Sequence, residues 1–118
     1  MDKKKLQKNI ELIERLISHK LKIINFFQTD LTKYKILLMV MMGHYKSQKT
    51  TIEKIIEDLP LTISSRAHKL NCITEATARG YLIKELSKTD LRKKNLIPSQ
   101  DLKEEFEEYL GILSSILK

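Results

Sequence analysis

The order of local signals between residues 50 and 99 constrains the fold of this chain more than any other feature of its sequence. Thr50 and Glu53 have the spacing of a capping box, in which a hydroxyl and a carboxylate each satisfy a backbone amide at the start of a helix. A short helix is therefore expected to begin there. Pro60 cannot donate a backbone hydrogen bond and disfavours a helical residue before it, which predicts that this helix ends near Leu59.

A second helix is predicted directly after a short turn. Ser64 and Ser65 can each cap a new helix through the side-chain oxygen. The helix is expected over residues 66–79, because Gly80 tolerates the left-handed conformation in which helices commonly end. The two segments together indicate a helix-turn-helix.

A hairpin is predicted after the second helix. Residues 81–86 are rich in strand formers, residues 87–92 form a polar loop with a cationic tip, and the chain returns through residues 93–97 to Pro98. Residues 46–49 can add a third short strand. This order of elements is typical of a winged helix-turn-helix, whose second helix enters a DNA major groove while the hairpin, or wing, reaches the neighbouring backbone or minor groove.

Charge is segregated along the chain. Residues 64–96 contain eight lysines and arginines and three acidic residues, whereas residues 97–118 contain two basic and five acidic residues. The whole chain has a formal net charge of +7 at pH 7. Because the positive charge coincides with the second helix and the wing, the pattern favours a polyanionic partner over an ordinary solvated surface. Basic patches also attract acidic proteins and membrane surfaces.

A helical projection of the second helix separates an apolar from a polar side. The apolar side is expected to pack on the rest of the domain and carries Leu70, Ile73, Thr74 and Thr77. The polar side can contact bases or phosphates, with Arg66 and Lys69 flanking the apolar stripe. With the wing included, the candidate DNA-binding residues are Ser64, Ser65, Arg66, His68, Lys69, Asn71, Cys72, Lys88, Asp90, Arg92, Lys93 and Lys94. For the helix taken alone, the alternative is the solvated face of a surface helix.

The wing carries the motif Ser87-x-x-Asp90-x-Arg92 between its two expected strands, after a helix that ends in Gly80. This arrangement resembles the wing of MarR-like transcriptional regulators, and the resemblance in organisation covers roughly residues 31–117. It implies a double-stranded DNA binder in which Asp90 organises the loop and Arg92 enters the minor groove. A narrow minor groove concentrates negative potential and so attracts an arginine. No effector pocket is carried over from the family.

The two ends of the chain are predicted to be amphipathic dimerisation helices. In residues 1–28, apolar side chains recur at steps of three and four, interrupted at Lys20. Ser99 can cap a final helix in residues 99–118, whose acidic first turns suit the helix dipole. Its apolar stripe is Leu102, Phe106, Tyr109, Leu113 and Ile116. A homodimer would place two reading helices about one DNA turn apart, and the alternative is that both terminal helices close over a monomeric core.

A central helix completes the expected domain. Asp30 or Thr29 can cap a helix over residues 31–45, which is apolar nearly all round and therefore belongs in the core. The side chains expected to face inward are Tyr34, Leu37, Leu38, Met41 and Met42. The methionines can alternatively line an effector cavity. We predict one domain, residues 1–118, mainly α with a small antiparallel β-hairpin, in which a winged helix-turn-helix (31–98) is flanked by the two dimerisation helices.

The sequence offers little support for catalysis or for metal binding. His68 and Cys72 are one helical turn apart, but no second pair of ligands accompanies them, so no metal and no cofactor are expected. Arg66, Lys69 and the helix dipole could lower the pKa of Cys72 and make it a thiol sensor, although single cysteines are more often inert. The other histidines have no evident acid or nucleophile beside them, and the three glycines form no phosphate loop. An enzyme is not expected.

The sequence therefore predicts a cytoplasmic, sequence-selective binder of double-stranded DNA that regulates transcription as a homodimer, with any effector ligand unknown. No signal peptide is evident, and the longest apolar run, at residues 36–43, is far below the ~20 residues that a membrane-spanning helix needs. The alternative is a protein-interaction adaptor that uses the winged-helix scaffold to hold an acidic partner. RNA binding is a weaker option, because the chain lacks an aromatic platform for single-stranded bases.

Overall fold

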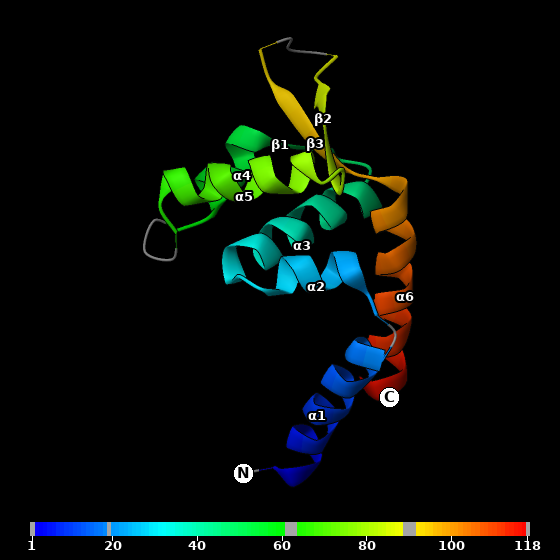
Figure 1. Cartoon of the computed structure of the whole chain (residues 1–118). Helices are drawn as coiled ribbons and strands as arrows, with labels where there is room; N and C mark the ends of the chain where they lie inside the picture. Colours follow the sequence, from blue (N-terminus) through cyan, green and yellow to red (C-terminus); the bar gives the residue numbers. More distant parts are fainter. Residues whose placement is uncertain (1, 19, 61–63, 89–91, 118) are drawn as a thin grey trace.

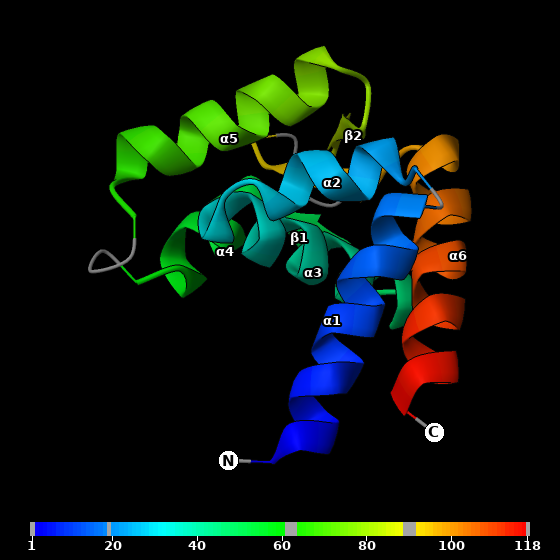
Figure 2. The same ribbon diagram turned by 60° about the horizontal axis from the view of Figure 1, so that its bottom comes forward.

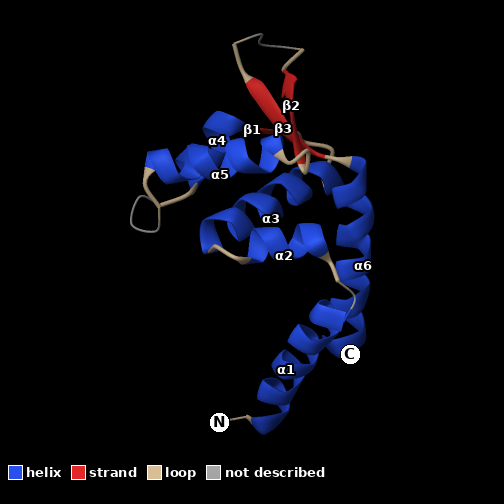
Figure 3. Ribbon diagram, viewed as in Figure 1, coloured by secondary structure: helices blue, strands red, loops and turns tan. Residues whose placement is uncertain are grey.

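A computed structural model describes residues 2–18, 20–60, 64–88 and 92–117. The elements in chain order are α1 (Lys3–Ser18), α2 (Lys22–Gln28), α3 (Leu31–Tyr45), β1 (Thr50–Thr51), α4 (Ile52–Asp58), α5 (Arg66–Ala78), β2 (Leu82–Leu86), β3 (Lys94–Pro98) and α6 (Gln100–Leu117). The predicted class, a mainly α winged helix-turn-helix with a small antiparallel sheet, is confirmed (Figures 1 and 3). Among the described residues, no helix has the length and apolarity needed to cross a bilayer.

The sheet has the strand order β1-β3-β2, and β2 and β3 form the predicted wing. Their antiparallel register pairs Ile83 with Ile97. The third strand lies at Thr50–Thr51 and not at the expected residues 46–49. The chain turns after α3 with Ser47 in the left-handed conformation (φ = 56°), so it reaches the edge of the sheet only after this turn.

The helix starts largely follow the predicted caps. Asp30 Oδ1 accepts the amide two residues further on at 2.6 Å, and Ser65 and Ser99 each accept the amide three residues further on at 3.1 Å. The helix α4 is capped by Thr51, which accepts the amide three residues on at 3.1 Å, and not by Thr50. The Thr50 hydroxyl is instead turned toward α3, where it donates to a backbone carbonyl at 3.4 Å.

The N-terminal segment forms two helices where one was expected over residues 1–28. The chain bends between α1 and α2, with Lys20 in the left-handed conformation (φ = 52°). Burial explains the bend, because Leu21, Ile24 and Phe27 are almost completely buried in the core. Of these two helices, α2 lies in the body of the molecule, whereas α1 extends away from it and runs alongside α6 (Figures 1 and 2).

The apolar stripe of α6 packs into the chain's own core. Its buried residues are Leu102, Phe106, Tyr109, Ile112 and Ile116, and Leu113 is partly buried beside them. The helix contacts both α1 and α2, and Arg15 Nη1 on α1 donates to Ser115 Oγ at 2.6 Å. Most of the apolar stripe of α6 is therefore covered within one chain.

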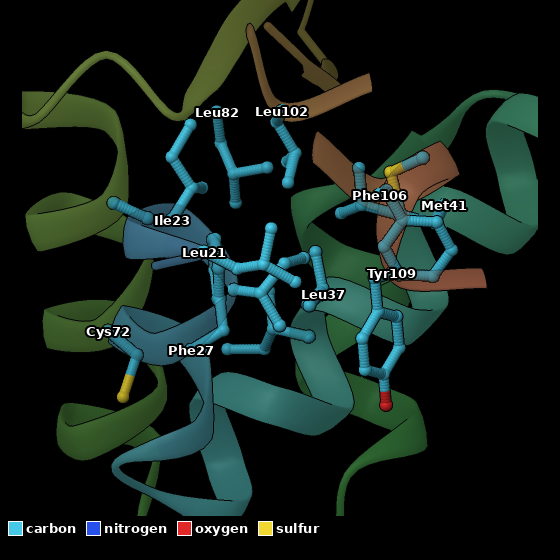
Figure 4. Packing of buried hydrophobic residues seen from close by; sticks show 14 of the residues in the cluster. Leu21, Ile23, Phe27, Leu37, Met41, Cys72, Leu82, Leu102, Phe106 and Tyr109 are labelled. Carbon is cyan, nitrogen blue, oxygen red and sulfur yellow. The ribbon is translucent and has the colours of Figure 1, made fainter. Parts of the chain in front are cut away.

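The helix α3 runs through the middle of the molecule, as predicted, but a different side of it faces inward. Leu37 and Met41 are buried in the core as expected (Figure 4). Leu38 and Met42 are exposed, whereas Ile36 and Val40 are buried. A helix that is apolar nearly all round has no periodic pattern that indicates which side its neighbours cover. The inward side of α3 was therefore predicted wrongly at Leu38 and Met42.

Glu105 caps α2 from another helix. Leu21, at the N-cap position of α2, supplies no side-chain hydrogen bond, and the amide of Ile24 donates to Glu105 Oε2 at 2.7 Å. Burial raises the pKa of the Glu105 carboxyl, and the hydrogen bonds from the α2 amides oppose that shift. The carboxylate therefore ties α6 to α2 at the point where the N-terminal segment bends.

Replacing Glu105 with alanine is expected to lower the free energy of unfolding by about 1–2 kcal/mol, because the α2 amides lose their acceptor. Urea denaturation at pH 7 measures the change. Glu105→Gln is the matched control: it keeps an acceptor oxygen and is expected to retain more than half of that stability. Equal midpoints for the alanine variant and the wild type would contradict a capping role for Glu105.

Candidate nucleic-acid interface

The two helices of the helix-turn-helix are joined by a buried lysine. Lys69 on α5 is 1% exposed, and its Nζ donates to the backbone carbonyls of Ile56 at 3.1 Å and Leu59 at 2.5 Å. These carbonyls belong to the last turn and the C-cap of α4, where an ammonium also interacts favourably with the helix dipole. The expectation that Lys69 lies on the polar, DNA-facing side of α5 is therefore wrong.

The inward face of α5 differs from the predicted one. Its buried residues are Lys69, Cys72, Ile73 and Ala76, which have the i, i+3, i+4, i+7 spacing of a single helical stripe. The predicted stripe instead paired Ile73 with Leu70 and Thr74, both of which are exposed. Cysteine packs as a small hydrophobic residue, and a lysine can bury its aliphatic stem, so this stripe is detectable only if both are counted as core residues.

Four of the candidate residues on or before α5 lie away from its open face. Ser64 is buried, as is Cys72. His68 turns toward α3, where its Nε2 is 2.8 Å from Asp30 Oδ2. Lys69 is bound to α4. The expectation that Ser64, His68, Lys69 and Cys72 lie on the open face of α5 is therefore wrong.

The open face of α5 retains three of the candidates and adds two residues that the projection missed. Ser65 caps the helix, and Arg66 and Asn71 are exposed. Leu70 and Thr74, expected to be inward, are exposed on the same helix. Leu70 is 38% exposed. These residues form the surface that α5 presents to a partner.

The wing carries exposed positive charge at its outer end. Lys88, Arg92, Lys93 and Lys94 are all exposed. The hairpin is closed next to them by a hydrogen bond from the Ser87 amide to the Lys93 carbonyl at 3.0 Å. Among the residues that the structure describes, Lys88, Lys93 and Lys94 form no ion pair. The candidate Asp90 lies outside the described residues.

The helix α5 lies on the outside of the molecule, and the wing extends from the sheet near its C-terminal end (Figures 1 and 2). Gly80 has φ = 78° directly after the helix, which confirms the predicted left-handed stop and turns the chain into β2. Arg79 and Glu75 are ion-paired at 3.7 Å, and Glu75 also pairs with Lys33 of α3 at 3.3 Å. The single acid on α5 is thus offset by two cations.

Burial disfavours a thiol-sensor role for Cys72. The Cys72 side chain is 3% exposed, and this desolvation raises the pKa of its thiol, with the Asp30 carboxylate adding to the shift. The expectation that Arg66 and Lys69 lower this pKa is wrong, since the Lys69 ammonium is bound to the α4 carbonyls. A raised pKa reduces the thiolate fraction at neutral pH and with it the reactivity of the thiol.

The fold is similar to that of known winged-helix proteins. A putative MarR-like transcription regulator from Bacillus cereus matches with a TM-score of 0.53 over 97% of this chain and 78% of that chain, at 21% identity. The heme sensor protein PefR from Streptococcus agalactiae, in complex with heme, matches with a TM-score of 0.51 over 95% of this chain and 77% of that chain, at 23% identity. No family model and no curated protein sequence matches the chain. The fold is that of a MarR-like winged helix, as the wing motif predicted.

Proposed function

We propose that this chain regulates transcription by binding double-stranded DNA, with α5 in a major groove and the wing on the adjacent backbone or minor groove. The observation that carries the proposal is an exposed helix on the outside of the molecule beside a wing with exposed cations (Figures 1 and 2). The fold shared with a MarR-like regulator supports the same function.

The outward residues of α5 have the chemistry of base readout. Arginine pairs with the O6 and N7 of guanine and asparagine with the N6 and N7 of adenine, which gives Arg66 and Asn71 direct roles. Leu70 and Thr74 offer apolar contact to the methyl group of thymine, which only the major groove displays. The proposed reading surface is therefore Arg66, Leu70, Asn71 and Thr74.

The wing supplies contacts that do not depend on base sequence. The exposed side chains of Lys88, Lys93 and Lys94 are proposed to neutralise phosphates, which dominate the affinity of protein–DNA complexes. By resemblance to MarR-like wings, Arg92 enters the minor groove and Asp90 organises the loop. Phosphate contacts of this kind fix the register of the protein on the duplex, and the helix then selects the sequence.

The salt dependence of binding tests the proposed function against an adaptor that holds an acidic protein. The logarithm of affinity for a labelled mixed-sequence duplex is expected to fall linearly with the logarithm of salt concentration, by about 0.9 per neutralised phosphate. Polyglutamate of matched length serves as the competitor. Displacement of the duplex by polyglutamate at equal charge concentration would favour the adaptor and contradict a duplex-specific surface.

We also propose that the chain acts as a homodimer, and an uncovered apolar stripe on α1 supports this proposal. Leu6, Ile10, Ile13 and Ile17 are between 42% and 66% exposed and repeat at steps of four and three, the spacing of a helix-packing seam. An apolar groove that includes Leu31 continues this surface between α1 and the body of the molecule. Regular rows of exposed apolar side chains on one helix face are typical of interfaces between subunits.

Replacing Ile13 with glutamate is expected to convert the protein from dimer to monomer, because it would bury an unpaired carboxylate in the middle of the seam. Sedimentation velocity measures the mass of the species in solution. Glu14→Gln, at an exposed neighbouring position of α1, is the control and should stay dimeric. A homodimer with a micromolar dissociation constant would be largely assembled at a protein concentration about 100 times higher. A wild-type protein that sediments as a monomer at that concentration would refute the dimer.

A further inference from the structure

Three potential metal ligands from two distant parts of the sequence meet between α3 and α5. Asp30 stands at the N-terminus of α3, and His68 and Cys72 lie one turn apart on α5. His68 Nε2 is 2.8 Å from Asp30 Oδ2 and 3.6 Å from Cys72 Sγ. All three ligand atoms lie within 4.8 Å of one another. The sequence indicated only the pair on α5, because Asp30 precedes His68 by 38 residues.

The two separations that involve His68 are close to those of a tetrahedral zinc site, and all three ligand atoms lie near enough for small side-chain shifts to bring them around one ion. Zinc bonds of about 2.0–2.1 Å to nitrogen or oxygen and about 2.3 Å to sulfur place the ligand atoms of a tetrahedron about 3.3–3.8 Å apart. The distance from His68 Nε2 to Cys72 Sγ already lies in this range. The distance from His68 Nε2 to Asp30 Oδ2 is that of a hydrogen bond and needs to lengthen by about half an ångström.

The Asp30 carboxylate is held in position for a ligand role. Its Oδ1 accepts the amides of Thr32 at 2.6 Å and Lys33 at 3.4 Å, so Oδ2 is the oxygen that faces His68. Hydrogen bonds behind a ligand are a regular part of metal sites because they fix its orientation. The nearby Lys33 ammonium is paired with Glu75 at 3.3 Å, which offsets its charge beside the cluster.

Cys72 is placed at the edge of the core, where its sulfur can reach the other two ligands. Figure 4 shows the Cys72 sulfur pointing away from the labelled core side chains. The side chains of Asp30 and His68 are 30% and 44% exposed, so an ion can enter from solvent. The cluster thus combines a buried thiol with two ligands that remain accessible.

We propose that Asp30, His68 and Cys72 bind a zinc ion that joins the N-terminus of α3 to α5. A thiolate with an imidazole favours zinc over magnesium and calcium, which prefer oxygen ligands. Three protein ligands leave a fourth position for water or an external ligand. Binding exchanges the Cys72 thiol proton for the metal and releases that proton to solvent. Zinc binding itself does not depend on the proposed DNA binding.

Cobalt titration of the reduced full-length chain tests the site. One equivalent of Co²⁺ is expected to produce the thiolate-to-cobalt charge-transfer band, and Zn²⁺ is expected to displace it. Cys72→Ser should abolish the band, and His68→Asn should weaken Zn²⁺ binding by at least about 10–100-fold. Asp30→Asn should weaken it similarly while preserving the helix cap, because asparagine caps as well as aspartate. His44→Asn, which removes an exposed histidine elsewhere on α3, should change nothing.

The unfolding temperature of each variant without metal shows whether the fold is retained. The wild-type titration does not depend on the stability of any variant. Absence of the charge-transfer band at one equivalent of Co²⁺ would overturn the proposal. Zn²⁺ binding by Cys72→Ser as tight as that of the wild type, or equal weakening by His44→Asn and His68→Asn, would also overturn it, because the ligands would then lie elsewhere on the surface.

Discussion

Replacing Arg92, Lys93 and Lys94 together with alanine is expected to weaken binding to duplex DNA by about 10²–10³-fold at low salt. Each of these wing cations is exposed and is proposed to contact a phosphate or the minor groove. The slope of log affinity against log salt should fall by about 0.9 for each phosphate contact removed, so by nearly two units for Lys93 and Lys94. Fluorescence anisotropy with a labelled duplex over a salt series measures both quantities.

A charge-matched variant separates the effect of the wing on DNA affinity from the effect of net charge. Lys3, Lys4 and Lys5 lie at the free end of α1, at the opposite end of the molecule from the wing (Figure 1). Their replacement by alanine removes the same formal charge and is expected to change affinity far less, because screening confines such charges to about 10 Å at 0.1 M salt. Equal losses for the two triple variants would remove the wing from the proposed interface.

Replacing Lys69 with alanine is expected to destabilise the fold by about 2–4 kcal/mol. The change leaves the carbonyls of Ile56 and Leu59 without their donor and opens a space where the aliphatic stem was packed. The melting temperature should fall by roughly 10 °C for a domain of this size. Urea denaturation and thermal unfolding followed by circular dichroism measure the two effects.

An exposed lysine on α4 provides the control for Lys69. Lys54 pairs with Asp58 at 3.5 Å on the surface, and Lys54→Ala is expected to change stability by less than about 0.5 kcal/mol. A similar, small change for both lysines would mean that the contact of Lys69 with the α4 carbonyls contributes little to the fold. The geometry of the helix-turn-helix would then depend on apolar packing alone.

Much of the fold was predictable because its boundaries rest on local chemistry. The caps at Asp30, Ser65 and Ser99 and the left-handed stop at Gly80 each act on amides or torsions within a few residues. The wing strands follow from strand-forming residues around a polar loop. These features depend on neighbouring residues and not on distant parts of the chain, so the amino-acid sequence is enough to predict the winged helix-turn-helix.

The candidate site was less predictable because tertiary contacts set the orientation of α5. The buried Lys69 donates to a carbonyl at the C-terminus of α4, and His68 turns toward Asp30 at the start of α3. Neither partner is visible from the periodicity of α5. The bend at Lys20 has a similar origin, since it lets Leu21 and the residues of α2 enter the core.

Selection from a library of random duplexes tests most directly whether the open face of α5 and the wing read DNA. The proposed dimer predicts enrichment of a two-fold-symmetric sequence whose half-sites are about 10–10.5 base pairs apart, centre to centre. Substitution of Asn71 by alanine should relax the preference at one position in each half-site and leave the others intact. Recovery of sequences no different from the starting library, at a salt concentration where the duplex is bound, would contradict the account.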